Sequence, residues 1–237
     1  MKPAQISSNQ IVRLKITLDD IKPAIWRRIE VPLATSLLAL HEVIQAVMLF
    51  ENCHLFDFVT GTRGTETRYI IPDPNDDFAD DDFGDTMDAS KTELGTLIEV
   101  GIKRLVYTYD FGDNWQHTIL IEAVAATDSG TSYPRFIEGA NRAPPEDVGG
   151  VPGFENFLNV MAKPKHPEYA DIKQWYGRTF DPMDIAEAKI ATRMAKLAKR
   201  QKNKNLPPKT QRSIDNKLYK ASRVTHRTLT ITQLCRR

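Results

Sequence analysis

The sequence predicts an α+β fold in which mainly antiparallel strands form a roll packed against helices, followed by a basic C-terminal extension. Three observations lead to this prediction: strand-like and helix-like hydrophobic periods occur along one chain, turn residues separate successive strands, and the charge changes sign after residue 188. With 237 residues and 41% hydrophobic content, the chain can form one sizeable core.

The first elements are a pair of strands and a helix. Apolar and polar residues alternate over 12–18, as in a half-buried strand, and a second strand is predicted over 25–31. The turn residues between them favour a close antiparallel pair. Residues 37–49 carry an apolar stripe at helical spacing, and Thr35 or Ser36 can cap the start of this helix.

The central and C-terminal elements follow the same patterns. The sequence predicts strands over 54–59, 67–71, 104–109 and 115–121, and helices over 92–100, 154–162, 167–177 and from 181 to 199 or 200. The turn at 110–114 should join two strands into a hairpin. We expect an exposed loop over the acidic segment 73–88 and loop structure from 125 to 150.

Charge divides the chain. Residues 1–188 carry 17 Lys and Arg against 30 Asp and Glu, whereas residues 189–237 carry 15 against 1. We therefore expect a domain over 1–200 and a basic, flexible tail over 201–237 that either contacts nucleic acid or neutralises the acidic segment 73–88. The candidate nucleic-acid contacts are Lys199, Arg200, Lys202, Lys204, Lys209, Arg212, Lys217, Lys220, Arg223 and Arg227.

Composition excludes several classes of protein. No run of about 18 apolar residues occurs, and residues 1–10 lack the apolar stretch of a signal peptide, so the sequence predicts a cytoplasmic protein without a membrane partner. Cys53 and Cys235 lie far apart and follow no ligand spacing, which indicates neither a disulfide framework nor a cysteine zinc site.

Two segments, 109–117 and 141–150, place carboxylates beside glycine, proline and asparagine. If the second folds over the hairpin turn of the first, a polar pocket forms from Asp110, Asp113, His117, Arg142, Glu146 and Asp147. Such a pocket could hold magnesium or manganese, with Asp113, His117, Glu146 and Asp147 as weak ligand candidates. The alternative is a turn-stabilising network in which Arg142 pairs with the carboxylates, and the sequence favours it.

Other motifs give weaker evidence about function. Residues 110–112 match the magnesium-binding triplet of protein kinases, but no glycine-rich loop, strand lysine or His-Arg-Asp loop precedes them. His41 and His54 are interpreted as packed or surface histidines rather than ligands. No cofactor is predicted, and a divalent metal remains only as the alternative stated above.

Several ordered motifs are similar to those of the plasmid pRiA4b open-reading-frame-three-like family: 23–28 (PAIWRR), 41–45 (HEVIQ), 54–56 (HLF), 109–117 (YDFGDNWQH) and 144–150 (PPEDVGG) with Gly153 and Phe154. The resemblance spans roughly residues 11–197 and implies a compact α+β domain with roll-like strands. Some members are labelled as TnpR-like resolvases. This chain lacks the serine-recombinase context that would support that label. Many members also have cysteines in the region matching 135–150, whereas this chain has none there.

The sequence supports two functional hypotheses. The first is a non-enzymatic interaction module of plasmid or mobile-element type, whose body binds a protein partner and whose basic tail contacts nucleic acid. The alternative is a metal-dependent hydrolase that acts on phosphodiesters through the Asp, Glu and His residues of the predicted pocket.

Overall fold

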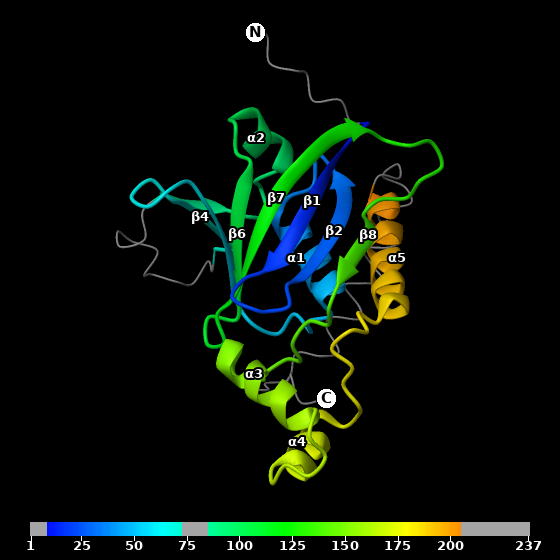
Figure 1. Cartoon of the computed structure of the whole chain (residues 1–237). Coiled ribbons are helices and arrows are strands. Elements are labelled where there is room, and N and C mark those ends of the chain that lie inside the picture. Colours follow the sequence, from blue (N-terminus) through cyan, green and yellow to red (C-terminus); the bar gives the residue numbers. More distant parts are fainter. Residues whose placement is uncertain (1–8, 73–84, 205–237) are drawn as a thin grey trace, which may run out of the picture.

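The structure is a computed structural model that describes residues 9–72 and 85–204 (Figure 1). Its strands are β1 (Gln10–Leu18), β2 (Ile25–Pro32), β3 (Phe56–Thr60), β4 (Thr67–Ile70), β5 (Asp85–Asp88), β6 (Arg104–Tyr109), β7 (Trp115–Ala126) and β8 (Arg135–Ala140). Within the described residues these eight strands form one sheet in the order β5-β4-β3-β6-β7-β1-β2-β8. Only β4 and β5 pair in parallel, so the predicted α+β class with mainly antiparallel strands is confirmed.

The described helices are α1 (Leu37–Met48), α2 (Leu94–Glu99), α3 (Gly150–Met161), α4 (Tyr169–Tyr176) and α5 (Glu187–Lys204). Helix α1 crosses one face of the sheet, α5 packs against α1 and β8, and α3 and α4 pack together beyond one end of the strands (Figure 1). No helix in the described ranges combines the length and apolar character needed to cross a membrane.

The main core lies between the sheet and α1. In β1 the even-numbered residues from Val12 to Leu18 are buried and Arg13 is exposed, because successive side chains of a strand point to opposite faces. Helix α1 buries most of its residues against this face, and Ser36 caps it by accepting a hydrogen bond from the Ala39 N–H at 3.2 Å. The predicted strand pair and helix are thus confirmed.

Arg27 is a charged residue inside the core. Only 1% of its surface is exposed, and its guanidinium donates to the carbonyl oxygens of Val47 at 3.0 Å, Trp26 at 2.8 Å and Ala140 at 2.9 Å. Burial lowers the pKa of Arg27 to about 10. Because these carbonyls belong to α1, β2 and β8, one side chain joins three elements.

Two loop predictions were wrong. Residues 125–150 contain the end of β7 and the edge strand β8, and residues 85–88 of the predicted acidic loop form β5. Strand β8 lacks a buried alternating pattern and is held by pairing with β2 and by ion pairs from Arg28 to Glu138 and from Arg135 to Glu30. Residues 73–84 lie outside the described residues.

The last helix also differs from the prediction. It begins at Glu187 rather than near residue 181 and continues to Lys204. Asp181 and Asp184 instead accept hydrogen bonds from the N–H groups of Met183 and Ala186, two residues further on, so these acids stabilise turns before the helix. Most of the predicted tail, residues 205–237, lies outside the described residues.

Neighbouring arginines on opposite faces of β2 test the role of Arg27. We expect Arg27→Met to lower the free energy of unfolding by about 2–4 kcal/mol, because buried carbonyls lose their donors. Arg28→Met is the matched control: Arg28 is partly exposed and pairs with Glu122 and Glu138, so its loss should cost under about 1 kcal/mol. Urea unfolding monitored by circular dichroism measures both, and equal losses would contradict this role.

Candidate functional site

Strand pairing brings His54 beside Asp110. Strands β3 and β6 are antiparallel with Phe56 opposite Tyr109, so Leu55, just before β3, lies opposite Asp110, just after β6, and His54 directly precedes this pair. The Asp110 N–H donates to the Leu55 carbonyl at 2.9 Å and fixes this junction. His54 also packs edge-on against the Tyr109 ring, with centroids 5.8 Å apart.

The loop before α3 folds over the β6–β7 turn, which is the condition that the predicted pocket required. The Gly149 N–H donates to Asp113 Oδ2 at 3.1 Å, and Gly150 lies against the backbone of Asp113. Two prolines, Pro144 and Pro145, precede the acidic pair in this loop. The two signature segments therefore meet in space and share one polar junction.

Three carboxylates from these segments meet His54, which precedes β3, and we call this group the His54 cluster: His54, Asp110, Glu146 and Asp147. His54 Nε2 lies 3.0 Å from Asp147 Oδ1, 3.5 Å from Asp110 Oδ2 and 3.7 Å from Glu146 Oε1. Asp147 is about half exposed, whereas the other three side chains are mostly covered. The cluster therefore opens to solvent on the Asp147 side.

Glu146 is the most constrained carboxylate of the His54 cluster. Its Oε1 accepts a hydrogen bond from the Tyr109 hydroxyl at 2.6 Å, and its Oε2 accepts one from the Glu51 N–H at 3.0 Å. Burial raises the pKa of Glu146, although these two hydrogen bonds oppose the shift. Burial and the hydrogen bond to Glu146 also raise the pKa of Tyr109, which keeps this phenol protonated as a donor.

A buried hydrogen-bond network supports the segment that carries His54. Gln45 Nε2 donates to the Tyr107 hydroxyl at 3.1 Å, and this hydroxyl lies 2.8 Å from His41 Nδ1. Because Asn52 Oδ1 can only accept, His41 Nε2 carries the proton and donates to it at 2.5 Å, and Nδ1 of the neutral ring accepts from the Tyr107 hydroxyl. Burial lowers the pKa of His41 to about 4, which agrees with a neutral ring in this role.

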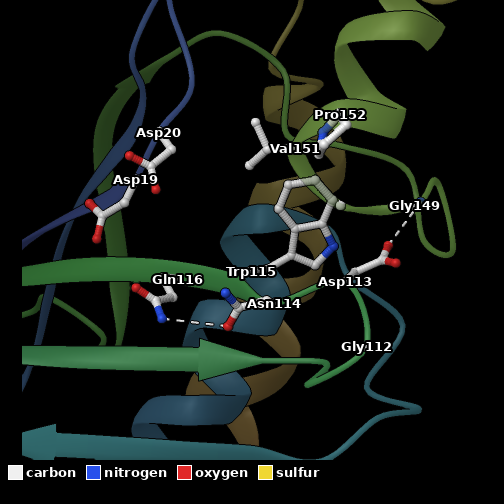
Figure 2. A pocket seen from close by; sticks show the side chains of 11 residues that line it. Asp19, Asp20, Gly112, Asp113, Asn114, Trp115, Gln116, Gly149, Val151 and Pro152 are labelled. Atoms are coloured by element: carbon white, nitrogen blue, oxygen red, sulfur yellow. Dashed lines mark hydrogen bonds between the residues drawn. The ribbon is translucent and has the colours of Figure 1, made fainter.

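Three predicted pocket residues lie outside the His54 cluster. His117 is fully buried on the inner face of β7, where Nδ1 faces the Trp115 carbonyl at 3.0 Å and burial lowers the pKa to about 4. Arg142 contacts Asp184 at 3.2 Å instead of Glu146 or Asp147. Asp113 belongs to a neighbouring hollow (Figure 2). Conversely, His54, interpreted from the sequence as a packed or surface histidine, lies at the centre of the cluster.

A divalent cation fits the chemistry of the His54 cluster. His54, Asp110 and Asp147 each offer one ligand atom within 4.8 Å of the others, and Glu146 offers another oxygen beside His54. Carboxylates suit magnesium, calcium and manganese, and imidazole suits zinc and other transition metals. Of the four metal candidates from the sequence, Glu146 and Asp147 lie here, whereas Asp113 and His117 do not.

The candidate nucleic-acid contacts are only partly described. Lys199, Arg200 and Lys202 are exposed on α5, and Arg200 forms an ion pair with Glu42 of α1. Lys204 ends α5. The remaining candidates lie outside the described residues: Lys209, Arg212, Lys217, Lys220, Arg223 and Arg227.

Gly150 tests the junction of the two segments. It has a φ of +66°, and an added Cβ would lie 2.7 Å from the Asp113 carbonyl oxygen. Gly101 is the control, because its φ is +90° and nothing lies within 4 Å of an added Cβ. We expect Gly150→Ala to destabilise the protein by about 1–3 kcal/mol more than Gly101→Ala in urea unfolding. Equal losses would mean that the contact with Asp113 does not constrain the loop.

Comparison with known proteins agrees with the motifs and the fold. The chain is 35% identical over 200 residues to the uncharacterized protein y4hQ of Sinorhizobium fredii, covering 80% of this chain and 97% of that protein. It is also similar to the crystal structure of MM3350, a protein of unknown function from Methanosarcina mazei Go1, with a TM-score of 0.66 and 36% identity over 76% of this chain and 96% of the other.

The family assignment follows from a match over most of the chain. Residues 10–189 match the model of the plasmid pRiA4b ORF-3-like proteins, and this range contains both signature segments and the whole sheet. The chain therefore belongs to the plasmid pRiA4b ORF-3-like family.

Proposed function

We propose that this protein is an interaction module that binds a divalent cation at the His54 cluster and contacts nucleic acid through basic side chains on and after α5. One observation carries the cation proposal: three carboxylates converge on one imidazole, and within the described part of the chain none of the three pairs with a lysine or arginine. A bound cation would offset this concentrated negative charge.

Manganese is the cation that we expect to fit best among common divalent ions. Asp110, Glu146 and Asp147 offer hard oxygen ligands, and the single imidazole of His54 adds a nitrogen ligand that magnesium and calcium seldom need. The partial exposure of Asp147 would leave the cation open to an oxygen of a second molecule, such as a phosphate.

A basic group near the start of α5 supports the nucleic-acid part of the proposal. Repulsion from Arg178, together with burial and repulsion from Arg142 and Arg193, lowers the pKa of Lys189. Arg142 has Asp184 as a partner, whereas neither Lys189 nor Arg178 forms an ion pair with a described residue. Excess positive charge of this kind favours phosphate groups.

The hydrolase alternative uses the same His54 cluster. A cation there would lower the pKa of a bound water, and Glu146, whose pKa burial raises, would be the nearby carboxylate able to accept a proton. Hydrolysis of a phosphodiester such as bis(p-nitrophenyl) phosphate with manganese, lost in Glu146→Gln, would support this alternative over a purely binding role.

Isothermal titration with manganese tests the cation site in the full chain. We expect Asp147→Asn and His54→Gln each to weaken binding by at least about tenfold, which corresponds to roughly 1.4 kcal/mol, because each removes one ligand. Asparagine also tolerates the φ of +56° at position 147. Asp171→Asn on α4 is the matched control and should bind as the wild type does. Equal affinity in all four proteins would remove the His54 cluster as a metal site.

Duplex DNA binding tests the basic segment. We expect the full chain to bind at least about tenfold more tightly at low salt than a chain ending at Arg200, and to show a steeper salt dependence, because each phosphate contact releases counterions. In the full chain, Lys189→Gln should weaken binding more than Lys163→Gln, which lies just after α3. Equal, salt-insensitive binding by the full and shortened chains would argue against the nucleic-acid role.

A further inference from the structure

Helices α3 and α4 and the segment after them share a group of aromatic rings beyond one end of the strands (Figure 1). Phe157 of α3 is buried at its centre and contacts three other rings, with centroid distances of 6.1 Å to Trp175, 5.3 Å to Tyr176 and 4.9 Å to Phe180. Tyr176 and Phe180 are partly buried, whereas Trp175 is 51% exposed. The largest ring of this group therefore lies at the surface.

The exposed indole of Trp175 is held in place. It extends from the last turn of α4, packs edge-on against Phe157 at an interplanar angle of 76°, and lies 6.5 Å from the Tyr176 ring. A tryptophan side chain has only two rotatable bonds, so it offers a large contact area and loses little conformational entropy on binding. Trp175 thus presents a fixed aromatic surface on which a flat ring can stack.

Positively charged side chains lie on the same group of rings. The guanidinium of Arg178 lies 4.9 Å from the centre of the Tyr176 ring, which is the ring next to Trp175. Lys189, in the first turn of α5, is close enough to Arg178 for repulsion from this arginine to be the main cause that lowers the pKa of the lysine. Arg178 and Lys189 are both exposed. The aromatic surface therefore borders two positive charges.

The nearest carboxylates in the sequence have other partners. Asp181 accepts a hydrogen bond from the Met183 N–H at 2.9 Å, and Asp184 accepts one from the Ala186 N–H at 2.8 Å and pairs with Arg142. Over residues 9–72 and 85–204, no carboxylate forms an ion pair with Arg178 or Lys189. Both cations are therefore available to a negatively charged ligand.

From these features we infer that the surface formed by Trp175, Arg178 and Lys189, which we call the Trp175 surface, binds single-stranded nucleic acid, with a base stacked on the indole and phosphates on the two cations. The inference rests on the nucleic-acid part of the proposed function and adds which form is bound. Bases inside a duplex are covered by their neighbours, whereas unpaired bases can stack on a side chain. Proteins that bind single strands without sequence preference combine aromatic rings with positive charge in this way.

Fluorescence anisotropy with the full chain tests the form of nucleic acid. The probes are an oligothymidylate of about 20 nucleotides, its duplex with oligoadenylate, and an abasic strand of the same length, which keeps the phosphates and lacks the bases. We expect the single strand to bind at least about fivefold more tightly than the duplex and the abasic strand. Oligouridine of the same length extends the comparison to RNA, and tighter binding of either single strand supports the inference.

The outcomes separate this inference from the proposed function. Equal affinity for the single strand, the duplex and the abasic strand would mean that the protein recognises charge alone, so the Trp175 surface would be wrong while the nucleic-acid role would stand. If the full chain bound none of the probes at low salt, the nucleic-acid role itself would fail, and this inference with it.

Variants distinguish stacking from charge. Trp175→Ala should weaken single-strand binding at least about fivefold and leave its salt dependence unchanged, because no charge is lost. Arg178→Gln should also weaken binding, but with a shallower salt dependence. Trp175→Phe keeps an aromatic ring and should retain affinity within about twofold. Val100→Ala is the control and should bind as the wild type does, since Val100 is exposed beside α2, at the other end of the molecule from α4 (Figure 1).

Tryptophan fluorescence reports on the stacked base directly. Binding of the single strand should quench the emission of the wild type, and Trp175→Phe should bind the strand without this quenching. Trp115 is only 1% exposed and should contribute little to the change. Quenching that persists in Trp175→Phe, or wild-type affinity in Trp175→Ala, would contradict the inference. If Trp175→Ala does not fold, the fluorescence of Trp175→Phe decides.

Discussion

The structure depends on the contact between the β6–β7 turn and the loop that leads into α3. Two hydrogen bonds make it, from the Tyr109 hydroxyl to Glu146 and from the Gly149 N–H to Asp113. The first lies on the side of the His54 cluster and the second on the side of the hollow. The His54 cluster exists only while this contact holds, because it takes carboxylates from the turn and from the loop.

The strand that carries Tyr109 explains why this contact can be rigid. Tyr107 and Tyr109 are both buried on the inner face of β6, and their hydroxyls reach polar groups on other elements: Tyr107 meets Gln45 and His41 of α1, and Tyr109 meets Glu146. Buried polar networks in which every member has a partner fix one arrangement of the surrounding elements. The core thus determines where the surface carboxylates lie.

The sequence predicted the elements that have a clear hydrophobic period and missed those held by polar contacts. Strand β1 and helix α1 bury their apolar positions as the pattern requires. Strand β8 was missed because it is held by pairing with β2 and by ion pairs of Arg28 and Arg135. Hydrophobic periodicity does not reveal contacts of this kind. The start of α5 was misplaced because Asp181 can cap a turn as well as a helix.

The candidate site was predicted in outline but not in composition. The sequence placed the two signature segments together, yet it assigned His117 and Arg142 to the pocket and missed His54. The error at His117 was avoidable, since alternation puts it on the same face as Trp115 and Ile119, which are core residues. His54 could have been found only by aligning Phe56 with Tyr109, and this register depends on long-range pairing that one sequence does not specify.

The β6–β7 turn contributes residues both to the His54 cluster and to the neighbouring hollow. Asp110 contributes to the His54 cluster, Asp113 lines the hollow, and the Asp110 side chain accepts hydrogen bonds from the N–H groups of Gly112 at 2.9 Å and Asp113 at 3.3 Å. The Asp110 carboxylate therefore holds the turn with Oδ1 and faces His54 with Oδ2, so the same side chain shapes the turn and contributes to the His54 cluster.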